Sequence, residues 1–226
     1  MFNNPYFGIV LSFVTYWIGV RLNKRFKNPF LNPLLISIAL CIAFLKGFHV
    51  PYKSYMMGGR FILFLIAPAT VALVVPLYRN IDLLKENFKA IFGGVLVGSL
   101  SVMVTIALLS KAFHLNLELV TSLLPKSITT AIGIPLAEEY GGFSAVTAIC
   151  IILTGILGGI IGPVFLKLIR VKDKVAFGVA MGTTSHAIGT ARSMEIGEVE
   201  GAMSGLCIGM AGIITVVLLP FILKLV

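Results

Sequence analysis

The residues best suited to bind a small acid are concentrated in two short polar segments of an otherwise apolar chain. Residues 121–137 place hydroxyl, glycine and proline residues around one lysine, and residues 175–192 add a histidine and an arginine to a run of threonine and serine. Hydroxyl, ammonium, guanidinium and backbone N–H groups all donate hydrogen bonds to carboxylate oxygens. The candidate binding residues are Lys126, Ser127, Thr129, Thr130, Gly133, Thr183, Thr184, Ser185, His186, Gly189, Thr190 and Arg192.

Proton coupling has two candidate residues. His186 belongs to the residue type that titrates nearest neutral pH, and Glu138 directly follows the first polar segment. We expect His186 to contact substrate or to carry a proton. The structural alternative is a neutral His186 that donates to a backbone carbonyl. The Ser and Thr hydroxyls have a structural alternative too, which is to hydrogen-bond the backbone of their own helix. For Lys126 and Arg192 the alternative is that their side chains extend to the membrane surface.

Both polar segments are predicted to be broken helices. Each has a central glycine, and Pro135 follows Gly133 by two residues, which disfavours a continuous helix. A break inside a membrane leaves backbone N–H and C=O groups unpaired, so it persists only where protein or water lines it. The N–H groups that begin a half-helix carry partial positive charge and suit a carboxylate. Two such segments that face each other form a recognised type of transporter site.

The composition indicates a membrane protein. Of 226 residues, 58% are hydrophobic and 12% are charged, whereas soluble domains have about 25% charged residues. The net charge of +9 comes from short basic clusters between apolar runs, which disfavours a nucleic-acid-binding surface. The three cysteines lack metal-ligand spacing, and the sequence contains no phosphate-binding loop or hydrolase motif. We therefore expect no enzyme activity, catalytic residue, metal site or cofactor.

Six apolar runs are long enough, or nearly so, to cross a bilayer. They are residues 6–20, 33–45, 61–78, 90–110, 142–166 and 201–226. Basic clusters follow the first run, precede the fourth and follow the fifth, and the positive-inside rule assigns all three to the cytoplasm. They share one side only if residues 121–137 form a re-entrant hairpin. The expected fold is therefore an all-α multi-pass membrane protein with about six spans and two opposed re-entrant hairpins.

An internal repeat supports opposed hairpins. Ala131-Ile132-Gly133 recurs 56 residues later as Ala187-Ile188-Gly189, and Gly98, Gly155 and Gly212 are spaced by 57 residues. Each match lies in the same order of broken segment, acidic loop and glycine-rich span. One hairpin plus one span is an odd number of crossings, so consecutive units must have opposite orientation. The sequence predicts one transmembrane domain in which N-terminal spans (residues 1–116) precede inverted units 117–170 and 171–226.

Three motifs of the chain resemble the LrgB/CidB family of bacterial membrane proteins. They are Pro68-Ala69-Thr70-Val71-Ala72-Leu73, Pro125-Lys126-Ser127-Ile128-Thr129-Thr130 and Ser185-His186-Ala187-Ile188-Gly189-Thr190-Ala191-Arg192. The resemblance covers essentially the whole chain. It implies a multi-pass protein of the cell membrane with an antiholin-like role in murein hydrolase activity and lysis, and a small LrgA- or CidA-like partner. Relatives that look like glycolate/glycerate translocators or pyruvate carriers imply transport of small carboxylates.

Residues and resemblance together favour a secondary carrier of a short monocarboxylate such as pyruvate, lactate, glycolate or glycerate. The substrate carboxylate is expected among the half-helix N-termini and hydroxyls, with Arg192 or Lys126 supplying positive charge. Glycines four residues apart on the spans predict tight helix packing or a homo-oligomer face. The alternative is a regulator of the holin/antiholin type, which requires oligomerisation but little polar architecture in mid-membrane.

Overall fold

The computed structural model describes residues 2, 4–26, 33–65, 68, 71–72 and 74–226. Within these residues all regular secondary structure is helical, which confirms the all-α class. The chain divides into two compact units, residues 1–72 and 73–226. Positions 69, 70 and 73 of the first family-like motif lie outside the described residues.

The N-terminal unit contains three helices, α1 (Pro5–Phe26), α2 (Pro33–Gly47) and α3 (Tyr52–Phe64). Small residues let α1 approach both neighbours closely. A Cβ atom at Gly8 would lie 3.1 Å from the Cα of Gly58 on α3, and the Thr15 hydroxyl lies 2.9 Å from that of Ser37 on α2. This is the packing that apolar helices in lipid require, because van der Waals contact and interhelical hydrogen bonds replace the hydrophobic effect there.

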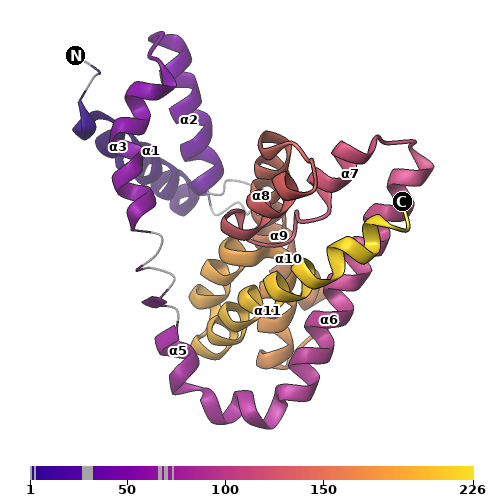
Figure 1. Cartoon of the computed structure of the whole chain (residues 1–226). Helices are drawn as coiled ribbons and strands as arrows, with labels where there is room; N and C mark the ends of the chain where they lie inside the picture. The colour runs from indigo at the N-terminus through magenta and orange to yellow at the C-terminus, as the bar shows by residue number, and fades with distance from the viewer. Residues whose placement is uncertain (1, 3, 27–32, 66–67, 69–70, 73) are drawn as a thin grey trace. The chain divides into compact units, whose positions relative to one another are not determined.

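The C-terminal unit contains the helices that hold both polar segments (Figure 1). They are α5 (Val74–Arg79), α6 (Ile81–Ala112), α7 (Leu117–Leu123), α8 (Thr130–Glu139), α9 (Ser144–Leu168), α10 (Lys174–Ile196) and α11 (Glu198–Leu223). Helix α10 packs against α6, α9 and α11. Gly178 and Gly182 of α10 pack against α11. A Cβ atom at Gly182 would come within 2.2 Å of the carbonyl oxygen of Ser204 on α11. The second polar segment is therefore at the centre of this unit.

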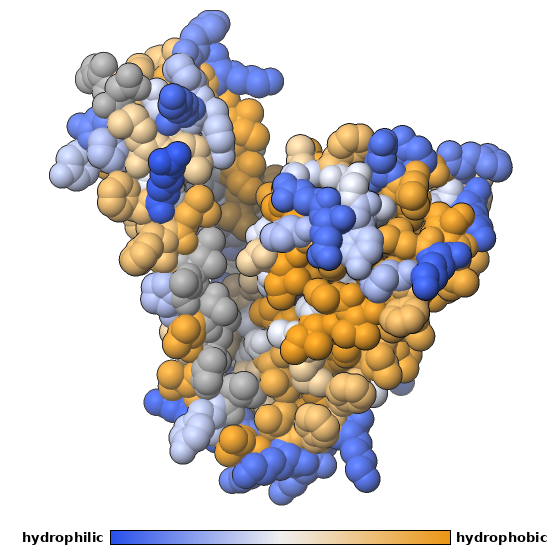
Figure 2. Space-filling model, viewed as in Figure 1, coloured by the Kyte–Doolittle hydropathy of each residue, from blue (hydrophilic) through white to orange (hydrophobic). Residues whose placement is uncertain are grey.

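Four of the described helices are long and apolar enough to cross a membrane, namely α1, α6, α9 and α11. They correspond to the predicted runs 6–20, 90–110, 142–166 and 201–226, and the protein is a multi-pass membrane protein. Large apolar side chains cover much of the outer surface of these helices, and Figure 2 shows hydrophobic surface over the C-terminal unit with hydrophilic side chains gathered at its ends. Lipid is the solvent that this surface fits.

Two of the six predicted spans, residues 33–45 and 61–78, are not confirmed among the described residues. Helix α2 has 15 residues, which at 1.5 Å per residue is about 22 Å and falls short of a hydrocarbon core of about 30 Å. Within the predicted run 61–78, α3 ends at Phe64, and residues 66–67, 69–70 and 73 lie outside the described residues. Apolar composition does not show where a helix ends, so these two spans stay predictions.

Candidate functional site

The second polar segment is broken at His186. Helix α10 is continuous on either side of this residue, whose φ of 40° and ψ of −133° are not helical. Positive φ in a residue other than glycine costs roughly 1–3 kcal/mol and persists only where surrounding contacts hold it. The sequence suggested a break at Gly189. The observed break, at His186, lies three residues earlier.

The contacts that hold His186 come from α9. The imidazole is 4% exposed, and its Nε2 lies 2.9 Å from the carbonyl oxygen of Ile151, to which it donates as Nε2–H. A Cβ atom at Gly155 would lie 2.6 Å from the ring Cε1, so only glycine leaves room for the ring. The structural alternative for His186, a bond to a backbone carbonyl, is therefore present.

Ser185 is accommodated in the same way as His186. A Cβ atom at Gly158 would lie 1.9 Å from the Ser185 hydroxyl oxygen. Gly189, on the other side of the break, sits close to the preceding turn, where a Cβ atom would be 2.5 Å from the Ser185 Cβ. The glycine therefore fits the kink rather than forming it. The spacing of the glycines of α9 predicts helix packing alone and gives no sign of their role beside the kink.

The hydroxyls of the second segment do not converge on one point. Thr183 and Thr184 donate to the carbonyls of Val179 and Ala180 at 2.7 Å, as helix-internal hydroxyls commonly do. The Thr190 hydroxyl lies 2.7 Å from that of Ser204 on α11. Thr183 and Thr184 thus border α6, Ser185 and His186 border α9, and Thr190 borders α11, because successive helical residues point in different directions.

The first polar segment is also interrupted. Helix α7 ends at Leu123, a turn follows, and α8 begins after Thr129, whose extended backbone forms the N-cap. Gly133 lies inside α8 rather than at the break, and a Cβ atom there would be 2.7 Å from the Ile151 Cδ1. Ile151 of α9 therefore contacts both segments, with its side chain at Gly133 and its carbonyl at His186.

The remaining candidates of the first segment lie in the turn and the start of α8. Lys126, Ser127 and Thr129 are half-buried and Thr130 is exposed. Within the described residues these four side chains make no hydrogen bond. Lys126 interacts electrostatically with Cys150, the residue before Ile151 on α9.

Two charged candidates lie away from this region. Arg192 is exposed near the end of α10 and pairs with Glu195. Glu138 is exposed at the end of α8 and accepts a hydrogen bond from the Ser144 hydroxyl. Among the described residues, no three His, Cys, Asp or Glu side chains are grouped so as to hold a metal ion.

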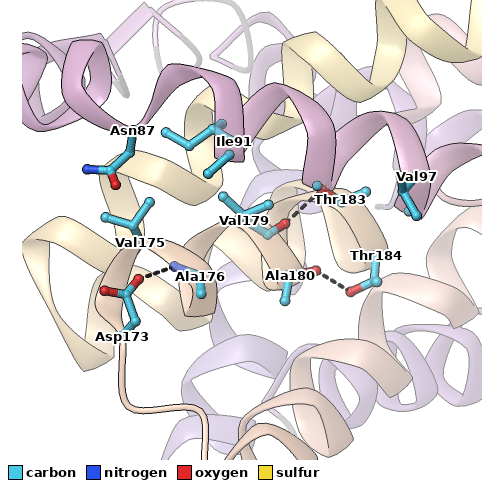
Figure 3. Close-up of a pocket in the computed structure, with 13 residues that line it drawn as sticks. Asn87, Ile91, Val97, Asp173, Val175, Ala176, Val179, Ala180, Thr183 and Thr184 are labelled. Carbon is cyan, nitrogen blue, oxygen red and sulfur yellow. Dashed lines mark hydrogen bonds between the residues drawn. The ribbon is translucent and has the colours of Figure 1, made fainter.

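A groove of about 550 Å³ lies between α6 and the first half of α10 (Figure 3). Asn87 and Asp173 mark one end of it, and Val97, Thr183 and Thr184 the other. Small and aliphatic residues line the length between them. The groove was not predicted, because it exists only where two helices distant in the sequence come together.

Comparison with known proteins finds relatives along nearly the full length of the chain. The model of the LrgB-like family matches residues 12–225. The antiholin-like protein LrgB of Bacillus mycoides (strain KBAB4) is 39% identical over 223 residues, which are 98% of this chain and 97% of that protein. Proteins of the same name from Bacillus cereus (strain B4264) and Bacillus anthracis (strain CDC 684 / NRRL 3495) match with the same identity and coverage. No solved structure matches significantly.

Proposed function

Because the chain belongs to the LrgB-like family, we propose that it is an antiholin-like regulator in the cell membrane, acting on murein hydrolase activity and lysis. The observation that carries this proposal is the 39% identity, over 98% of the chain, to relatives named antiholin-like. An oligomeric assembly with a small LrgA- or CidA-like membrane protein belongs to the same proposal. The apolar exterior of the spanning helices offers lipid-facing surface for such partners.

The test of the antiholin-like role is a lysis assay. A bacterium that lacks its own LrgB-type gene receives this chain, alone or with an LrgA-type partner, and detergent-induced lysis and murein hydrolase activity are measured. Expression is expected to change the lysis rate relative to a strain that makes an unrelated multi-pass protein at the same level. Equal lysis rates in the two strains, with the chain present in the membrane, would contradict the role.

A second candidate function, transport of a small monocarboxylate, is favoured by the two broken helices. Both breaks lie just before the repeated tripeptide: the first ends at Thr129, two residues before Ala131, and the second is at His186, one residue before Ala187. Irregular backbone at membrane depth requires a protein or water lining, and paired broken helices are a common basis of secondary transporters. A regulator without cargo has no evident use for such a pair.

Reciprocal contacts support the inverted repeat that this second function needs. A Cβ atom at Gly155 would lie 2.8 Å from Ile188 Cδ1, and one at Gly212 would lie 2.7 Å from Ile132 Cδ1. Ile132 and Ile188 are 56 residues apart, and the two glycines 57. The isoleucine after each break thus contacts the glycine-rich span of the other unit. This exchange supports the proposal of two related units with opposed hairpins.

Within the carrier proposal, the substrate carboxylate binds near the start of α8. Lys126, Ser127, Thr129 and Thr130 make no side-chain hydrogen bond within the described residues, whereas Thr183, Thr184 and Thr190 already have partners. The first segment therefore has more donors to offer than the second. His186 then holds the second break against α9 and is also the candidate to carry the coupling proton.

The test of transport is uptake of labelled pyruvate and glycolate into proteoliposomes that contain the purified chain, with and without an LrgA-type partner. The carrier proposal expects uptake that saturates with substrate and falls when Lys126 is replaced by Gln. Lys111→Gln, an exposed lysine at the end of α6, is the matched control. A monodisperse, helical sample that takes up neither acid under either condition would overturn this function and leave the antiholin-like role standing.

A further inference from the structure

We propose that the groove between α6 and α10 binds one acyl chain of an anionic phospholipid, with the lipid phosphate at the basic end of the groove. The lining between the two ends is hydrocarbon, from Ala90, Ile91 and Val97 on α6 and Val175 and Val179 on α10 (Figure 3). In a membrane protein such a lining favours an acyl chain. This proposal does not depend on either function proposed above.

The polar groups in the groove do not favour a small acid. The hydroxyl hydrogens of Thr183 and Thr184 are already donated to backbone carbonyls of α10. The Asn87 amide donates to the Leu83 carbonyl at 2.9 Å, and the Asp173 carboxylate accepts from the Ala176 N–H at 2.7 Å. A soluble carboxylate would therefore meet few available donors in the groove.

The groove has the length of one acyl chain. Asn87 and Gly98 line it eleven residues apart on α6, and Asp173 and Thr184 line it eleven residues apart along α10. At 1.5 Å per residue each wall is about 16 Å long. The hydrocarbon of one leaflet is about half of 30 Å. An acyl chain that enters at Asn87 therefore reaches the far end near the middle of the bilayer.

The end marked by Asn87 and Asp173 carries an excess of positive charge. Exposed basic residues flank it in the sequence on both helices, and the turn between α9 and α10 belongs to the cluster that the positive-inside rule assigns to the cytoplasm. These residues are Lys85, Lys89, Arg170, Lys172 and Lys174. The acidic residues near this end are three, Asp82, Glu86 and Asp173, against the five basic ones. Asp173 caps α10, and Asp82 lies 3.7 Å from Lys85. Basic side chains at a membrane surface attract anionic headgroups. Each such side chain raises the affinity for an anionic lipid about fivefold.

The experiment measures lipid binding to the full chain in mild detergent by native mass spectrometry. The probes are dioleoylphosphatidylglycerol and dioleoylphosphatidylcholine, which share acyl chains and differ in charge. The expected result is at least tenfold tighter binding of the phosphatidylglycerol. The double variant Lys172→Gln/Lys174→Gln lowers its affinity about tenfold or more and leaves phosphatidylcholine unchanged. Lys111→Gln, at the other end of α6, changes neither.

A second variant tests the groove itself. Ala180→Phe places a large side chain between the walls and is expected to weaken both lipids, whereas Ala145→Phe, at an exposed position of α9 outside the groove, has no effect. Ala176→Leu replaces Ala180→Phe if the latter does not elute as a single helical species. The proposal would be overturned by equal affinity for the two lipids or by unchanged phosphatidylglycerol binding in the groove variants. Competition by inorganic phosphate alone would also overturn it, as would a dimer that is lost only in the groove variants.

Discussion

The Nε2 atom of His186 lies 2.9 Å from the carbonyl oxygen of Ile151, so a single hydrogen bond fastens the break in α10 to the spanning helix α9. The same isoleucine contacts Gly133 of the first polar segment through its side chain. One turn of α9 therefore contacts both polar segments. Changes in this turn should affect both segments, whichever of the two functions is correct.

Loss of the His186 side chain should destabilise the protein. His186→Ala removes a buried ring and its hydrogen bond and keeps the unfavourable positive φ, so we expect a loss of about 2–4 kcal/mol. His114→Ala is the control, because His114 also has positive φ, 52°, but is exposed. Thermal unfolding in detergent measures both variants. Similar melting temperatures for the two would show that the contact with Ile151 contributes little.

The glycines of α9 are expected to be less tolerant of substitution than other glycines of the spans. Gly155→Ala brings a methyl group within 2.6 Å of the His186 ring, and overpacking of this kind costs about 1–3 kcal/mol. Gly209→Ala on α11 has open space around it and gains helix propensity, so it should be neutral or slightly stabilising. Unfolding temperatures of the two variants provide the comparison. A stable Gly155→Ala protein would mean that the ring moves without cost.

The inverted repeat predicts a specific compensation. Gly212→Ala should be destabilising because its methyl group meets Ile132 Cδ1 at 2.7 Å, and Ile132→Val, which removes that atom, should restore most of the loss. Gly155→Ala should be only partly restored by Ile188→Val, since the His186 ring also occupies that space. Double-mutant cycles on unfolding temperature measure the coupling. Independent effects at both pairs would count against the reciprocal contact.

The buried pair Thr190 and Ser204 should stabilise the second half of α10 against α11. Their hydroxyl oxygens are 2.7 Å apart and both residues are nearly inaccessible, so Thr190→Val leaves a buried hydroxyl without this partner at a cost of about 1–3 kcal/mol. Thr105→Val on exposed α6 surface removes only a bond to its own helix and serves as control. If unfolding shows equal effects, the pair is not a fixed interhelical contact.

Cysteine labelling should place the two basic stretches beside the groove on one side of the membrane. Lys85→Cys and Lys172→Cys are expected to react with a membrane-impermeant maleimide from the same side, because Asn87 and Asp173 line one end of one groove. Lys111→Cys should react from the opposite side, since α6 crosses between them. Labelling above the background of the native cysteines is measured in intact cells and in inverted vesicles. Opposite sidedness of Lys85 and Lys172 would contradict the arrangement.

A transport role makes a further prediction for His186. His186→Gln should lower pyruvate uptake at least tenfold and alter its dependence on pH, while His114→Gln leaves both unchanged. Gln can donate a hydrogen bond but cannot take up a proton at neutral pH. Uptake into proteoliposomes across a pH series measures the effect. Unchanged uptake with unchanged pH dependence would remove His186 from the transport mechanism.

The amino-acid sequence shows that both polar segments are interrupted, but it indicates the positions of the breaks only approximately. Gly133 and Gly189 were the expected break points, yet the structure breaks the chain before Ala131 and at His186. Glycine lowers helix propensity, but a glycine can also be present inside a helix because a neighbouring side chain leaves no room for a Cβ atom. Gly133 lies against Ile151, and Gly189 against the turn that contains Ser185. Propensity cannot separate these two causes, because neighbouring helices do not appear in a one-dimensional sequence.

An all-helical multi-pass membrane protein of the LrgB type, with two polar and interrupted segments, can be recognised from the amino-acid sequence. Composition, apolar run length and motif identity carry that information locally. The tertiary structure alone decided that Ile151 contacts both segments, that most hydroxyls of the second segment are already paired, and that α6 and α10 enclose a groove. These are contacts between residues far apart in the chain, and their distances depend on how side chains of different helices fill the space between them.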